Sequence, residues 1–184
     1  LMATLHAYGI TNLLVKMNAE VPILDGSALE LCALLDEGGV TEQGEGIDEI
    51  VIDRRYAVGS EDPAQKGIVI EPADVFEVHY TLEYPEPVGR QEYTFRMTDA
   101  DAFRREIAPA RTFGFVKEIE ALEQMGLASG GRLNNFILVG EEGVVNAPLR
   151  FRDEFVRHKI LDICGDFYLL GRPIRGRLVG GKTG

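Results

Sequence analysis

The sequence is poor in cysteine and has no long apolar run. Its 184 residues include two cysteines, Cys32 and Cys164, each inside an apolar helical pattern. Such cysteines favour reduced thiols in a cytoplasmic setting over a disulfide. No apolar run approaches the roughly 18 residues of a membrane span, and the first residues lack the basic start of a signal peptide. We therefore expect a cytoplasmic protein without an integral membrane segment.

Basic residues are also scarce. The chain has 19 Lys and Arg against 30 Asp and Glu, for a formal net charge of −11. This charge disfavours nucleic acid or an anionic membrane as the main partner, because both would repel it. With 45% hydrophobic and 27% charged residues, the chain has material for one sizeable core or two small ones. It shows no repeat and no low-complexity tract.

Residues 1–46 are expected to form short elements that end in a linker. The predicted elements are a helix over 1–8 closed by Gly9, a strand over 13–17, a turn at 25–26, and a helix ending at Gly38-Gly39. Ser27 and Glu30 match the Ser-x-x-Glu capping box at the start of that second helix. The polar, glycine-rich residues 41–46 are the best candidate for a domain boundary.

Residues 47–184 contain most of the predicted strands. The predicted strands are 50–58, 67–70, 75–84, 91–97, 136–139, 144–145 and 174–179, with 75–84 and 91–97 as an antiparallel pair. The predicted helices are 98–107, one through Ile119, Leu122 and Met125 to Gly126, and one around residue 158. In residues 111–115, two phenylalanines flank a glycine. They could form a flat wall for a ligand or a strand in the core, and the spacing favours the core.

The helix around residue 158 carries the strongest chemical signal. His158, Asp162 and Asp166 recur every four residues and form one polar stripe, with Lys159 at its margin. The opposite side is apolar, so we expect a core helix whose stripe lies in a semi-enclosed space. An imidazole nitrogen and a carboxylate oxygen one turn apart can share a zinc ion. A side-chain hydrogen bond or a surface pair would also explain this weak motif.

The other two histidines are less informative. His6 lies in the first predicted helix with no second ligand at helical spacing, so we interpret it as a structural or surface histidine. His79 falls on the polar face of its strand together with Glu77 and Glu83, so we expect it to be exposed.

Four stretches together resemble one family, the zinc-dependent UDP-3-O-acyl-N-acetylglucosamine deacetylases of lipid A biosynthesis. They are residues 21–28 (VPILDGSA), 110–115 (ARTFGF), 126–131 (GLASGG) and 151–166 (FRDEFVRHKILDICGD). The likeness runs in order over nearly the whole chain. It implies an α+β fold of two domains that each pack helices on a β-sheet, with the site between them. Residues 1–46 would be the end of an incomplete first domain, and residues 47–184 the second.

The resemblance also implies roles for individual residues. His158 and Asp162 match two of three zinc ligands, with iron as an alternative metal. The third ligand would be a histidine in a Glu-His pair directly before Leu1, whose glutamate is the base, and a further histidine is expected after Gly184. Thr112 and Asp166 match catalytic positions. Lys159, Phe113 and Tyr84 match substrate-binding positions, whereas Arg132 stands where a smaller residue is expected beside the acyl chain.

The implied reaction is zinc-assisted hydrolysis of the N-acetyl amide on a UDP-linked acylated glucosamine. We expect the isolated chain to be inactive, because the Glu-His pair and the later histidine are not in it, and we expect a monomer. The alternative is a non-catalytic module on the same scaffold that binds UDP-sugars or a protein. A purely structural acidic domain would leave the polar stripe unexplained.

Overall fold

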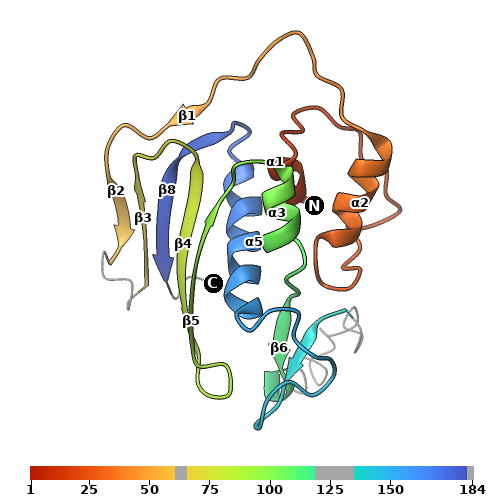
Figure 1. Cartoon of the computed structure of the whole chain (residues 1–184), viewed down its shortest axis with the longest axis vertical. Helices are drawn as coiled ribbons and strands as arrows, with labels where there is room; N and C mark the ends of the chain where they lie inside the picture. Colours follow the sequence, from red (N-terminus) through yellow and green to blue (C-terminus); the bar gives the residue numbers. More distant parts are fainter. Residues whose placement is uncertain (61–65, 119–134, 182–184) are drawn as a thin grey trace.

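The computed structural model describes residues 1–60, 66–118 and 135–181 (Figure 1). The helices are α1 (Met2–Ala7), α2 (Leu29–Gly38), α3 (Ala100–Glu106) and α5 (Glu154–Tyr168). The strands are β1 (Ile50–Val51), β2 (Tyr56–Gly59), β3 (Gly67–Glu71), β4 (Phe76–Glu83), β5 (Arg90–Arg96), β6 (Phe113–Phe115), β7 (Ile137–Val139) and β8 (Ile174–Gly181). Helices beside a mixed sheet confirm the α+β class. The domain division after residue 46 stays a prediction.

The main sheet is organised around β8. Its strand order is β2-β3-β8-β4-β5, and β1 pairs with the start of β8. Strand β8 runs antiparallel to β3 but parallel to β4 and β1. The hairpin of β4 and β5 is antiparallel, as predicted. Strands β6 and β7 form a separate two-stranded parallel sheet, which lies below α5 and α3 in Figure 1.

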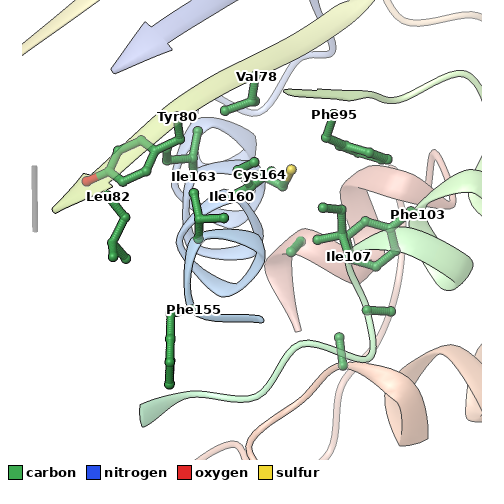
Figure 2. Close-up of a cluster of buried hydrophobic side chains, with 14 of the residues drawn as sticks. Val78, Tyr80, Leu82, Phe95, Phe103, Ile107, Phe155, Ile160, Ile163 and Cys164 are labelled. Atoms are coloured by element: carbon green, nitrogen blue, oxygen red, sulfur yellow. The ribbon is translucent and has the colours of Figure 1, made fainter. Parts of the chain in front are cut away.

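The core lies between the sheet and α5. Figure 2 shows Val78, Tyr80 and Leu82 of β4 on the side of Ile160 and Ile163 of α5. The three β4 side chains are buried together because alternate residues of a strand point to one face. Each fully buried side chain of this size contributes about 1.5–3 kcal/mol to stability. Helix α5 thereby becomes the central helix, with the sheet on one side and α1 and α3 on the other (Figure 1).

Helix α1 approaches α5 closely at Gly165. A Cβ atom added to Gly165 would stand 3.3 Å from the Ala3 backbone nitrogen and 3.6 Å from the Met2 Cβ. Nearby, His6 Nδ1 donates a hydrogen bond to the Cys164 carbonyl oxygen at 2.8 Å. The first turn of α1 is therefore packed against the part of α5 that carries Asp162 and Asp166.

Both cysteines are free and buried, as the sequence predicts. Among the helices that the structure describes, none combines the length and the apolar character needed to cross a membrane. His6 is buried and structural, whereas His79 is only partly exposed and its Nδ1 lies 2.8 Å from the Thr94 hydroxyl oxygen. The predicted helix to Gly126, the 126–131 stretch and Arg132 lie outside the described residues.

Three local predictions are wrong, and a fourth holds only in part, because residues 144–145 form an isolated antiparallel bridge from Val144 to Val139 rather than a strand. Residues 13–17 form no strand, and Leu14 is 77% exposed, because a strand needs a partner for its backbone groups. The predicted strand 50–58 is split into β1 and β2. The capping box does not form, because Ala28 is the N-cap of α2 and the Ser27 hydroxyl donates to Asp25 Oδ1 at 2.7 Å.

Candidate metal and substrate site

His158 is buried on α5 with a defined tautomer. Its residue is 8% exposed, and its Nδ1 lies 2.9 Å from the Ala110 carbonyl oxygen. A carbonyl oxygen can only accept, so Nδ1 carries a proton, and in the neutral ring the lone pair is on Nε2. A histidine ligand to a metal is usually fixed in this way, with one ring nitrogen donating to the protein and the other facing the ion.

Asp162 faces the free nitrogen of His158. Its Oδ1 lies 3.4 Å from His158 Nε2, and its Oδ2 lies 3.5 Å from Lys159 Nζ. The Asp162 side chain is 41% exposed, so this contact alone adds little to stability. The helical spacing therefore brings the predicted imidazole and carboxylate together, with the Lys159 ammonium group beside them.

The chemistry of this pair fits a metal only in part. One imidazole nitrogen and one carboxylate oxygen are ligands that zinc accepts, but a catalytic zinc site needs three protein ligands. Within residues 1–60, 66–118 and 135–181, no group of three or more His, Cys, Asp or Glu is arranged to hold a metal. His158 and Asp162 can thus supply two ligands of a larger set.

Asp162, Asp166 and Lys159 line one pocket of about 580 Å³. Leu1, at the start of the chain, lines the same pocket, as does Tyr80 of β4. Partial desolvation raises the pKa of Asp166, the negative charge of Asp162 raises that pKa further, and Lys159 opposes both effects. Asp166 is exposed, so the expected semi-enclosed stripe is correct for His158 and not for Asp166.

Thr112 lies on the segment whose Ala110 carbonyl oxygen accepts the hydrogen bond from His158. Its backbone N–H donates to the Gly26 carbonyl oxygen at 2.8 Å, and its own carbonyl oxygen accepts from Ile137 N–H at 2.7 Å. Ala110, the acceptor for His158, is two residues earlier. Thr112 is therefore held from both sides and stands close in the chain to the contact that orients His158.

Tyr84 and Phe113 belong to one aromatic cluster. The Tyr84 ring centroid lies 5.7 Å from that of Phe113 and 5.4 Å from that of Phe115. Phe113 also packs edge-on against Phe155 of α5 at 4.7 Å. Tyr84 and Phe115 line an open, mostly apolar cavity of about 590 Å³ that also includes Lys117. Strand β6 thus packs on the core through Phe113 and lines the cavity through Phe115.

Glu154 is a buried carboxylate that was not predicted from the sequence. It is 0% exposed and accepts hydrogen bonds from the backbone N–H and the guanidinium of Arg111. The two residues are 43 positions apart, so no local pattern pairs them. One signal was available, because Glu154 lies four residues before His158 and extends the polar stripe by a turn.

Comparison with known proteins agrees with the resemblance. A family model described as LpxC, UDP-3-O-acyl N-acetylglycosamine deacetylase, matches residues 1–184. Relatives that carry the name UDP-3-O-acyl-N-acetylglucosamine deacetylase include three from different bacteria. The protein from a Nitratiruptor species is 45% identical over 179 residues, which are 96% of this chain and 59% of the relative. The protein from Myxococcus xanthus is 46% identical over 187 residues, 100% of this chain and 58% of the relative.

The third relative, from Thermodesulfovibrio yellowstonii, is 40% identical over 185 residues, 100% of this chain and 62% of the relative. The chain therefore spans about 60% of the length of these relatives. The match covers the helix with His158 and Asp162 as well as the Thr112 segment, since it extends over every residue. On these grounds the chain belongs to the family of UDP-3-O-acyl-N-acetylglucosamine deacetylases.

Proposed function

We propose that this chain carries much of the active site of a zinc-dependent amide hydrolase. The reaction is removal of the N-acetyl group from UDP-3-O-acyl-N-acetylglucosamine in lipid A biosynthesis, by metal-assisted attack of water. The observation that carries the proposal is the His158 imidazole, whose Nδ1 is bound to a backbone carbonyl and whose Nε2 faces Asp162, in a chain of this family.

His158 and Asp162 are the residues that would hold the metal, which is zinc or alternatively iron. When bound, the metal would polarise the amide carbonyl and lower the pKa of water. His158 offers the lone pair of Nε2, because its other nitrogen is already engaged. Leu1 and Asp162 line the same pocket, which supports a third ligand from a Glu-His pair directly before Leu1.

The other site residues act on the substrate and on protons. Thr112, held by Gly26 and Ile137, donates a hydrogen bond from its hydroxyl group to the oxyanion that develops on the amide carbonyl. Asp166 orients a further histidine, a role that suits a partly desolvated carboxylate. Lys159 binds the diphosphate, and the cavity at Tyr84 and Phe115 accepts the uracil ring, with Phe113 behind it.

The test uses the full-length gene product. Zinc content is measured by inductively coupled plasma mass spectrometry. Acetate release is followed with UDP-3-O-acyl-N-acetylglucosamine as substrate. We expect about one zinc per chain and hydrolysis that a chelator abolishes. A metal-free, inert full-length protein would refute the proposal. The 184-residue chain alone should bind zinc weakly and show no turnover, since its described residues offer only two of the three proposed ligands.

A second candidate is a non-catalytic module that binds UDP-sugars or a protein. It is favoured by one observation, that the described residues contain no set of three metal-ligating side chains. Saturable binding of the UDP-sugar by the full-length protein, without zinc and without acetate release, would establish this module instead. We also propose a cytoplasmic monomer, which cell fractionation and sedimentation of the full-length protein would test.

A further inference from the structure

We propose that Glu154 is a positioning residue that holds the Ala110–Thr112 segment against His158 through Arg111. Its effect on catalysis rests on the proposed function, whereas its effect on the geometry of His158 does not. Glu154 is one helical turn before His158 on the same face of α5, and both side chains contact the same short segment of the chain.

Glu154 binds both the main chain and the side chain of Arg111. Its Oε1 accepts from Arg111 N–H at 3.1 Å and from Arg111 Nε at 2.8 Å. Its Oε2 accepts from Arg111 Nη2 at 3.2 Å and from the backbone N–H of Arg150. Glu154 is fully buried and the Arg111 side chain is 11% exposed, so water cannot replace these contacts readily. A charge-assisted fork of this kind sets both position and orientation.

Arg111 stands between the two residues that matter for the site. The preceding residue, Ala110, provides the carbonyl oxygen that accepts from His158 Nδ1 at 2.9 Å. The following residue is Thr112. Fixing the Arg111 backbone therefore fixes the Ala110 carbonyl and the Thr112 backbone together. The contacts form a closed ring, which runs from Glu154 through Arg111 and Ala110 to His158 and back along one turn of α5.

The same network reaches the turn before α2. Arg150, whose N–H binds Glu154, donates from its side chain to Asp25 Oδ2 at 2.6 Å and to the Pro109 carbonyl oxygen at 2.9 Å. Arg111 Nη2 also donates to the Pro148 carbonyl oxygen at 2.7 Å. Glu154 is the acceptor common to Arg111 and Arg150, so its charge organises contacts from three segments. Loss of that charge leaves the Arg111 guanidinium without its carboxylate partner and the Arg150 backbone N–H without a charged acceptor.

The first experiment reads the tautomer of His158 in the metal-free chain. Long-range proton–nitrogen NMR spectra of a histidine-labelled sample distinguish a protonated ring nitrogen from a bare one, at a pH that keeps the ring neutral. We expect wild-type His158 to be the Nδ1–H tautomer alone. In Glu154→Gln we expect a mixture of tautomers and faster exchange of the Nδ1 proton, because the Ala110 carbonyl is held less firmly.

The matched control is Asp153→Asn. Asp153 is the neighbouring carboxylate, and its Oδ1 binds Arg157 Nε at 2.7 Å rather than the 110–112 segment. This variant should keep the wild-type His158 tautomer. A folded Glu154→Gln chain with the wild-type tautomer would overturn the proposal. If Glu154→Gln does not fold, Arg111→Lys decides the matter, because lysine keeps the charge but cannot form the fork.

The second experiment measures kinetics in the full-length protein. Glu154→Gln should lower kcat by roughly 10–100-fold with little change in KM, as expected when an outer contact of a ligand is lost. Asp153→Asn should leave both constants unchanged. If Glu154→Gln shows the tautomer mixture while the wild-type full-length protein is inert, the proposed function is rejected and this inference stands. If the wild-type enzyme is active and the folded Glu154→Gln variant keeps the wild-type kcat and tautomer, this inference is rejected and the proposed function stands.

Discussion

His158 of α5 and His6 of α1 are both buried and differ in what faces the second ring nitrogen. Each is 8% exposed, and each donates Nδ1 to a backbone carbonyl oxygen, at 2.9 Å to Ala110 and 2.8 Å to Cys164. His6 is enclosed by the rings of Phe76 and Tyr168, at 4.9 and 5.0 Å, whereas His158 Nε2 faces Asp162. Burial and a fixed tautomer therefore do not distinguish the two histidines. The carboxylate at the second ring nitrogen is what singles out His158 as the proposed ligand.

The two carbonyl acceptors are held by different means. Cys164 belongs to α5 itself, so the partner of His6 is fixed by the helix. Ala110 belongs to a separate segment, which Gly26, Ile137 and Glu154 hold in place. His158 should therefore respond to changes that loosen the segment around Ala110, whereas the acceptor of His6 is fixed by α5 itself.

Replacing each histidine by alanine in the full-length protein should separate the two roles most clearly. His158→Ala removes a proposed metal ligand, so deacetylation should fall by at least roughly 100-fold, since loss of an outer contact alone costs about 10–100-fold. His6→Ala should lower stability and leave the rate of the folded protein largely unchanged. Steady-state kinetics and zinc content are the measurements. Near-normal activity of His158→Ala would show that His158 is not a metal ligand and does not differ from His6 in this respect.

Gly26→Ala should disturb the segment that holds the partner of His158. Gly26 has φ of +84°, and an added Cβ would lie 2.4 Å from the Asn135 carbonyl oxygen and 3.1 Å from Thr112 Cγ2. The free energy of unfolding should drop by about 3 kcal/mol or more, from backbone strain and steric overlap.

Gly9→Ala is the control for Gly26→Ala, because Gly9 also has positive φ, +63°, but nothing within 4 Å of the added Cβ. Its cost should be about 1 kcal/mol, from the backbone conformation alone. Denaturant unfolding measures both variants. Equal costs would show that the space around Gly26 is not tight.

Acid should destabilise the fold through His6. Burial lowers the pKa of His6 from the ordinary 6.5, so the folded state binds protons less readily than the unfolded chain. Stability from this residue is complete above pH 6.5 and is lost as the pH falls through the lowered pKa. Urea unfolding at a series of pH values should show a weaker acid slope in His6→Gln. An identical slope in that variant would exclude His6 as the cause.

The smallest effect should come from Gly165→Ala, at the contact between α1 and α5. Alanine is a better helix former than glycine by about 0.8–1.0 kcal/mol, but the tight approach to Ala3 offsets that gain. Gly38→Ala, in α2, has open space around the new Cβ and should keep the gain. Thermal unfolding compares the two. Equal stabilisation would mean that α1 shifts to make room for the new Cβ at Gly165 without a cost in stability.

The helical part of the site was predictable because helix geometry is local. Four-residue spacing places His158, Asp162 and Asp166 on one face, and the structure puts His158 Nε2 3.4 Å from Asp162 Oδ1. The buried face of β4 followed in the same way from alternation of its residues.

The tertiary part could not be predicted from local patterns. Ala110 is 48 positions from His158, and Arg111 is 43 from Glu154, so only packing brings them together. The alternation of residues 13–17 predicted a strand that is absent, because alternation describes a side-chain pattern and does not supply the neighbouring strand that backbone groups need.

The placement of β8 has a consequence for synthesis on the ribosome. This strand begins at Ile174 yet lies between β3 and β4, which begin at Gly67 and Phe76. A nascent chain can form the hairpin of β4 and β5 early, but β3 and β4 have a vacant edge until residues 174–181 emerge from the exit tunnel. Closure of the sheet is therefore a late, long-range event in translation, and the growing polypeptide must keep two open strands from pairing elsewhere in the meantime.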